Sequence, residues 1–104
     1  MSPRIQIERW VVDELSAFPL SRAAKLKFLI DLRTHLPANY LRIRGLRCEN
    51  NPTCFWYSRL AEQDRKVHMV RLAVDDSSPD VLRVVWAACW CVTFCHTIGL
   101  RCCD

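Results

Sequence analysis

Glycine and proline are scarce in this sequence, and several common kinds of segment are absent. Two glycines and five prolines among 104 residues argue against a linker, a collagen-like segment or a low-complexity tail. The opening residues lack the long apolar run of a secretory signal, which predicts a reducing, cytoplasmic environment. The sequence also has no glycine-rich loop for nucleotide phosphates, so nothing in it indicates a GTPase.

Cysteine, in contrast, is abundant, with seven residues, of which five follow residue 88. An odd number of cysteines without a secretory signal argues against a complete disulfide framework. We therefore expect Cys89, Cys91 and Cys95 to pack as small apolar residues. We predict no cofactor and no metal. The alternative is a zinc site formed by Cys91, Cys95 and His96, because three intervening residues between the cysteines suit this metal.

The composition predicts a packed core and a basic surface. Hydrophobic residues make up 51% of the chain and aromatic residues 10%, which is enough for a single domain over residues 1–104. The formal net charge is +4, and the basic residues gather in the middle of the chain. Such a surface can face nucleic-acid phosphates, an acidic partner or solvent. The basic residues in this middle region are Arg42, Arg44, Arg47, Arg59, Arg65, Lys66 and Arg71.

The first third of the chain predicts a short strand and two helices. Apolar and polar residues alternate over 5–7, as in a half-buried strand. Apolar residues then recur at helical spacing up to Pro19, and Ser21 is suited to cap a second helix. We expect this second helix to end before Pro37, because a residue that precedes proline avoids the helical region. The result is a predicted helical hairpin over about 9–36.

The periodicity changes from helical to alternating after Pro37. Leu41 and Ile43 alternate with arginines, which predicts a two-faced strand. Three more strand-like runs follow, joined by short polar turns, at 55–60, 67–74 and 81–90. The predicted fold class is therefore α+β: a short strand, a helical hairpin and then an antiparallel β-meander over about 41–90. A cysteine-rich segment, 91–104, completes the chain.

The stretch 84–100 contains no lysine, arginine, aspartate or glutamate. Its length is at the lower limit for a helix that spans a membrane. His96, Thr93 and Gly99 interrupt its apolar character, and its first half has a β-type pattern. We therefore predict a buried strand that continues into a short terminal segment, with a spanning helix as the alternative and a membrane partner as unlikely.

Four stretches of the sequence resemble the RelE/ParE family of bacterial toxins. They are AKLKFL at 24–29, LRIRGLR at 41–47, FWYSRL at 55–60 and KVHMVRLAV at 66–74, followed by a hydrophobic strand. In that family a helical hairpin packs on a twisted antiparallel sheet. The resemblance covers about four-fifths of the chain, and it implies the same α+β architecture.

The resemblance also implies a function and partners. RelE-like members cut messenger RNA on the ribosome, ParE-like members inhibit DNA gyrase, and an antitoxin neutralises the toxin. It implies His68 as the acid or base of a metal-independent endoribonuclease, with Arg59 and Arg71 holding the phosphate. We expect these side chains to share one face of the sheet. The implied nucleic-acid-binding residues are Arg42, Arg44, Arg47 and Lys66.

A second interpretation is that the protein is not an enzyme. A small interaction protein, encoded by a phage or virus, would bind a host protein through its aromatic, cysteine-rich C-terminal part. Trp56, Trp86 and Trp90 would be its anchors, and the same surface could form a homodimer. Exposure of Trp90 would favour this interpretation, whereas burial would favour a self-contained domain.

Overall fold

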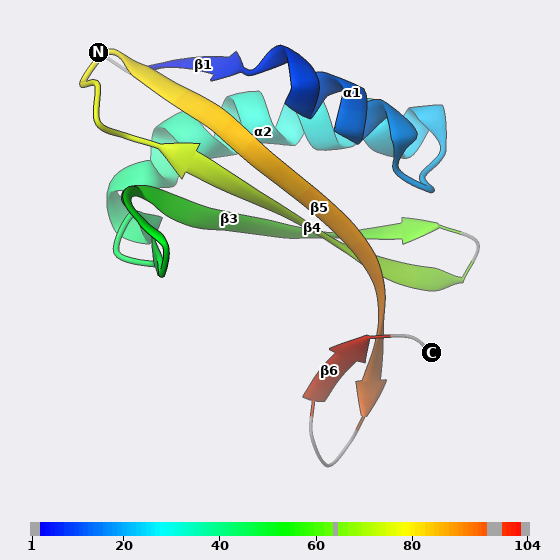
Figure 1. Cartoon of the computed structure of the whole chain (residues 1–104). Coiled ribbons are helices and arrows are strands. Elements are labelled where there is room, and N and C mark those ends of the chain that lie inside the picture. The colour runs from blue at the N-terminus through cyan, green and yellow to red at the C-terminus, as the bar shows by residue number, and fades with distance from the viewer. Residues whose placement is uncertain (1–2, 64, 96–98, 103–104) are drawn as a thin grey trace.

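Two helices cover one face of a mixed β-sheet, and the other face of the sheet is left without a helix (Figure 1). The computed structural model describes residues 3–63, 65–95 and 99–102. The elements are β1 (Arg4–Ile7), α1 (Arg9–Ala17), α2 (Arg22–Ile43), β2 (Arg47–Cys48), β3 (Asn51–Gln63), β4 (Lys66–Asp75), β5 (Val81–Cys95) and β6 (Gly99–Cys102). The predicted α+β class is confirmed, with a strand, a helical hairpin and antiparallel strands in that order.

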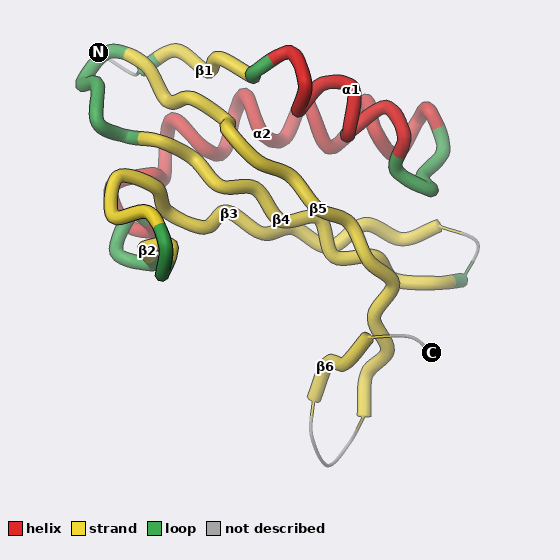
Figure 2. The backbone as a smooth tube through the Cα atoms, viewed as in Figure 1, coloured by secondary structure: helices red, strands yellow, loops and turns green. Residues whose placement is uncertain are grey.

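The sheet has the strand order β1-β5-β4-β3-β2, and β6 pairs with the end of β5. The first strand pairs in parallel with β5, from Arg4 opposite Val81 to Ile7 opposite Val84. The long strands pair antiparallel: β3 pairs with β4, and β4 pairs with β5. Beyond its partner β4, the far end of β5 bends away from the rest of the sheet and carries β6 with it (Figure 2).

The core lies between the helices and the covered face of the sheet. Strand alternation places Phe55 and Tyr57 of β3, and Val70 and Leu72 of β4, on this face, where they are buried. Helix α1 lies over β5 and α2 over β3. The helical residues buried in this core are Val11, Leu15, Phe28, Leu32 and Leu36. Ser21 caps α2 as predicted, since its hydroxyl accepts the amide hydrogen of Ala24 at 3.1 Å.

Helix α2 does not end at Pro37, so the predicted strand over 41–44 is wrong. The helix continues to Ile43 with Pro37 inside it. An internal proline costs a helix about 3 kcal/mol. Packing offsets this cost, because Tyr40 and Ile43 extend the apolar stripe of the helix onto the core. The side-chain amide of Asn39 also donates a hydrogen bond to the carbonyl oxygen of His35 at 2.8 Å.

The C-terminal region is a strand where it is described. Strand β5 extends to Cys95, so the alternative of a membrane-spanning helix over 84–100 is wrong for these residues. None of the described helices is long and apolar enough to cross a membrane. Cys89 packs against the core as expected. Cys91 is disulfide-bonded, which contradicts its expected packing as a free thiol and removes it from the alternative zinc set. The side chain of Cys95, and His96, lie outside the described residues.

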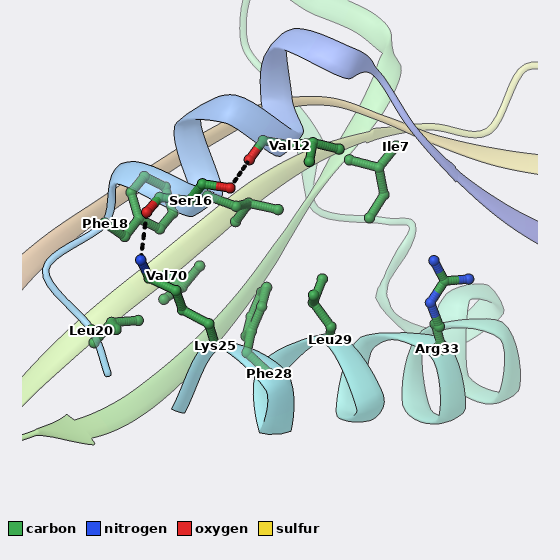
Figure 3. A pocket seen from close by; sticks show the side chains of 11 residues that line it. Ile7, Val12, Ser16, Phe18, Leu20, Lys25, Phe28, Leu29, Arg33 and Val70 are labelled. Atoms are coloured by element: carbon green, nitrogen blue, oxygen red, sulfur yellow. Dashed lines mark hydrogen bonds between the residues drawn. The ribbon is translucent and has the colours of Figure 1, made fainter. Parts of the chain in front are cut away.

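A partly open apolar pocket of about 230 Å³ lies between the two helices and the sheet, beside the end of β1 (Figure 3). Val12, Phe18 and Leu29 are among its walls, and Lys25 lies at its rim. The ammonium group of Lys25 crosses from α2 and donates a hydrogen bond to the carbonyl oxygen of Ser16, near the end of α1. This contact joins the two helices on the side of the molecule that faces away from the uncovered sheet face.

Candidate nucleic-acid interface

The sheet register divides the three residues expected to act together in catalysis, with Arg59 and His68 on one side of the sheet and Arg71 on the other. Arg59 pairs with Val70, which is fully buried beneath the helices, so Arg59 belongs to the covered side. Ser58 pairs with Arg71, and this pair belongs to the uncovered face. His68 pairs with Ala61, again on the covered side. The expectation of one shared face is therefore wrong, because side chains alternate with a period of two and 68 and 71 differ by an odd number.

His68 is enclosed by the protein. Only 7% of its surface is exposed, and its Nδ1 atom has no hydrogen-bond partner in the described part of the chain. A buried imidazole does not reach an RNA strand on the surface. His68 therefore lies on the opposite side of the sheet from Arg71, and, unlike the exposed Arg59 on its own side, it is buried.

A groove of about 480 Å³ follows the outer edge of β3 beside the C-terminal half of α2. It curves around this edge, because Arg59 comes from the covered side and Arg71 from the uncovered face. Four of its side chains are basic or imidazole groups, and none of its described lining residues is acidic. We call this site the basic groove; its lining residues are His35, Asn39, Arg42, Ile43, Leu46, Trp56, Tyr57, Ser58, Arg59 and Arg71.

Arg71 is held in a defined orientation on the uncovered face. Its Nε donates a hydrogen bond to the hydroxyl oxygen of Ser58 at 3.2 Å. Its guanidinium carbon lies 5.3 Å from the ring centre of Trp56 and 5.6 Å from that of Trp90. Two cation–π contacts and one hydrogen bond restrict the rotamers of this long side chain, so less entropy is lost when it binds an anion.

Arg44 and Arg47, which are predicted to bind nucleic acid, both contact the carboxylate of Asp76. The guanidinium group of Arg47 forms a bidentate ion pair with the two carboxylate oxygens of Asp76, at 2.6 and 2.9 Å. The Nε atom of Arg44 contacts one of these oxygens at 3.1 Å. The side chain of Asp76 is only 6% exposed. The hydrogen bonds from Arg47, opposed by burial, hold the pKa of the Asp76 carboxyl below its ordinary value. This cluster ties the end of α2 and β2 to the loop after β4.

The two remaining predicted nucleic-acid residues fall in different places. Arg42 is exposed on α2 and lines the basic groove. Lys66 begins β4 and pairs with Gln63. Gln63 is four residues after Arg59 on β3, a distance of about 13 Å along the strand. The structure thus brings together Arg42, Arg59 and Arg71 and leaves Lys66 at the far end of the hairpin.

A second hollow, of about 800 Å³, lies on the other side of Arg59 along the same strand edge. It shares Ser58 and Arg59 with the basic groove, but its walls also carry Lys27, Asp31 and Glu62. Its two carboxylates balance its two cations. We call it the mixed hollow.

Sequence reasoning missed His35 and Tyr57 as groove residues. His35, Asn39 and Arg42 are spaced as one face of a helix, but the expected break at Pro37 hid this pattern. Tyr57 has a buried hydroxyl without a hydrogen-bond partner among the described residues. Burial raises the pKa of the Tyr57 hydroxyl, against the opposing charge of Arg59 and with a smaller contribution from Asp31, so the hydroxyl stays protonated and able to donate a hydrogen bond.

Trp90, the residue expected to separate the two functional interpretations, is half-buried. It lies beneath the guanidinium of Arg71. Comparisons with protein-family models, curated proteins and solved structures found no match to this chain.

Proposed function

We propose that the protein binds single-stranded RNA in the basic groove and cleaves it, as an RNA-cutting toxin of the RelE/ParE type that an antitoxin neutralises. One observation carries the proposal: Arg42, Arg59, Arg71 and His35 line a groove in which no described residue is acidic. Arginine binds phosphate through paired N–H donors, so three arginines in a groove whose described lining carries no carboxylate favour a phosphate chain. The order of a strand, a helical hairpin and antiparallel strands supports the same family.

The shape of the groove favours a single strand over a duplex. It runs around a strand edge and includes the indole of Trp56 beside the arginines. Proteins that bind single-stranded RNA combine cationic side chains for the backbone with aromatic rings for unstacked bases.

The proposed reaction is an internal phosphoryl transfer. The 2′-hydroxyl of one nucleotide loses its proton to His35, and its oxygen forms a bond to the adjacent phosphorus. The bond from phosphorus to the 5′-oxygen then breaks, and this oxygen takes a proton from water. The hydroxide that remains takes up the proton held by His35, which restores the base. The products are a 2′,3′-cyclic phosphate and a free 5′-hydroxyl. Arg59 and Arg71 stabilise the negative charge that builds on the phosphate oxygens. His35 takes the role that the resemblance gave to His68, because His35 is exposed and lines the groove.

Regulated expression in bacteria tests this function. Growth, protein solubility and cellular messenger RNA are followed for the wild type, for Arg42→Ala/Arg59→Ala and for Arg22→Ala/Arg33→Ala. The control pair removes the same charge from exposed positions of α2 outside the basic groove. We expect growth arrest and messenger RNA loss with the wild type and the control, and neither with the groove variant.

Three outcomes would contradict the proposal. The first is normal growth while soluble wild-type protein accumulates. The second is equal arrest by the wild type and the groove variant. The third is arrest with intact messenger RNA and a loss of DNA supercoiling, which would indicate gyrase as the target.

A further inference from the structure

Three tryptophans and one arginine form a cluster on the uncovered face of the sheet. Trp56 lies on β3, Arg71 on β4, and Trp86 and Trp90 on β5. Trp56 and Trp86 pack edge to face, with ring centres 5.5 Å apart, and Arg71 lies over Trp56 and Trp90. The register accounts for this grouping, because Ala73 pairs with both Trp56 and Trp86. We call Trp56, Arg71, Trp86 and Trp90 the tryptophan cluster.

The base of the cluster is fixed, and its outer part is open. Trp56 packs against a small buried group on this face that includes Cys48, Cys54 and Ala73. Trp86 remains 39% exposed, although burial of an indole would stabilise the fold. A large aromatic surface left in solvent beside a positioned arginine is typical of a binding surface.

The tryptophan cluster is continuous with the basic groove. Trp56 and Arg71 belong to both, and Ser58, which accepts the hydrogen bond from Arg71, lines the groove as well. An RNA strand whose phosphates lie in the groove would therefore pass Trp56 where it leaves the groove. At that point it would lie beside the exposed ring of Trp86. A cationic groove that adjoins an aromatic surface, with Arg71 belonging to both, suits an anionic polymer that carries planar aromatic groups.

We propose that the tryptophan cluster is a stacking platform for an unpaired nucleobase of the RNA strand, with Trp86 as the ring that the base covers. The inference rests on the proposed function and deepens it, because the ligand must be single-stranded and must carry bases. Stacking on aromatic side chains tolerates every base, since each has a π-face. The platform thus provides affinity for unpaired RNA without selecting a sequence, and it excludes a duplex, whose bases are already stacked.

Binding of two probes, a short single-stranded RNA and an abasic ribose-phosphate strand of the same length, tests the platform. The proteins are the wild type, Trp86→Leu and the control Trp10→Leu, whose indole is 48% exposed on α1. We expect Trp86→Leu to bind the RNA about 5- to 100-fold more weakly and the abasic strand unchanged. Trp10→Leu should match the wild type with both probes.

A measurement on the wild type alone keeps the test independent of any folding defect in the variant. Indole fluorescence should be quenched by the RNA and not by the abasic strand. Equal affinity of the wild type for the two probes, or an equal loss for both in Trp86→Leu, would overturn the platform and leave the basic groove in place. Failure of the wild type to bind either probe would overturn the proposed function as well.

Discussion

The basic groove and the mixed hollow lie side by side along β3, yet they differ in charge. Both contain Ser58 and Arg59, and both are formed between β3 and α2. The groove adds His35, Arg42 and Arg71 without a carboxylate among its described residues, whereas the hollow adds Lys27, Asp31 and Glu62. An anionic ligand is attracted by the first site and is opposed in the second by two nearby carboxylates. The comparison shows that the missing acids, as much as the arginines present, define the candidate site.

The largest expected effect comes from breaking the ion-pair cluster of Arg44, Arg47 and Asp76. Asp76→Asn removes the carboxylate that Arg44 and Arg47 share, and it should lower the free energy of unfolding by about 2–3 kcal/mol. Urea unfolding measures this change. Asp80→Asn, an exposed residue later in the same loop, is the control and should change stability by less than about 0.5 kcal/mol. Equal stability of the wild type and Asp76→Asn would contradict the account of this cluster.

The same cluster predicts a dependence of stability on acid. The folded protein lowers the pKa of Asp76, so the stabilisation is complete above the ordinary pKa of the carboxyl and is lost as pH falls through the lowered value. The difference in unfolding free energy between the wild type and Asp76→Asn should therefore shrink from about pH 5 to about pH 2. A difference that stays constant or grows over this range would show that the Asp76 charge is not its source.

The smallest expected effect comes from making the mixed hollow resemble the basic groove. Asp31→Asn/Glu62→Gln removes two carboxylates near Arg59 while it preserves the shape of both side chains. Weaker repulsion should strengthen RNA binding by about 2- to 3-fold, and high salt should remove the gain. Fluorescence anisotropy with labelled RNA checks both expectations. Weaker binding by this variant would show that the carboxylates contribute favourable contacts.

Local sequence patterns predicted most of the elements. The strand at β1, the end of the first helix before Pro19 and the Ser21 cap all follow from local chemistry. Pro37 misled the prediction, since its local cost is real but is exceeded by packing of Tyr40 and Ile43 on a core formed by distant residues. The parallel pairing of β1 with β5 joins opposite ends of the chain, and no local pattern encodes it.

The candidate site was predictable in part. Arg42, Arg59 and Arg71 were identified by type and position, and the structure gathers them in one groove. The separation of His68 from Arg71 follows from strand alternation alone and was available in the sequence. The ion pairs of Arg44 and Arg47 with Asp76 could not be predicted from the sequence, because they depend on how the loop after β4 meets the end of α2.

Direct RNA binding at several salt concentrations tests the central claim, that an acid-free groove of arginines holds the phosphate chain. Arg42→Ala/Arg59→Ala should bind single-stranded RNA about 10-fold or more weakly than the wild type. It should also flatten the slope of log affinity against log salt by about 1.4. Arg22→Ala/Arg33→Ala, whose side chains lie outside the basic groove and the mixed hollow, should retain the wild-type affinity and slope. Equal affinities and slopes for the two double variants would mean that RNA responds to total charge, and the basic groove would not be the binding site.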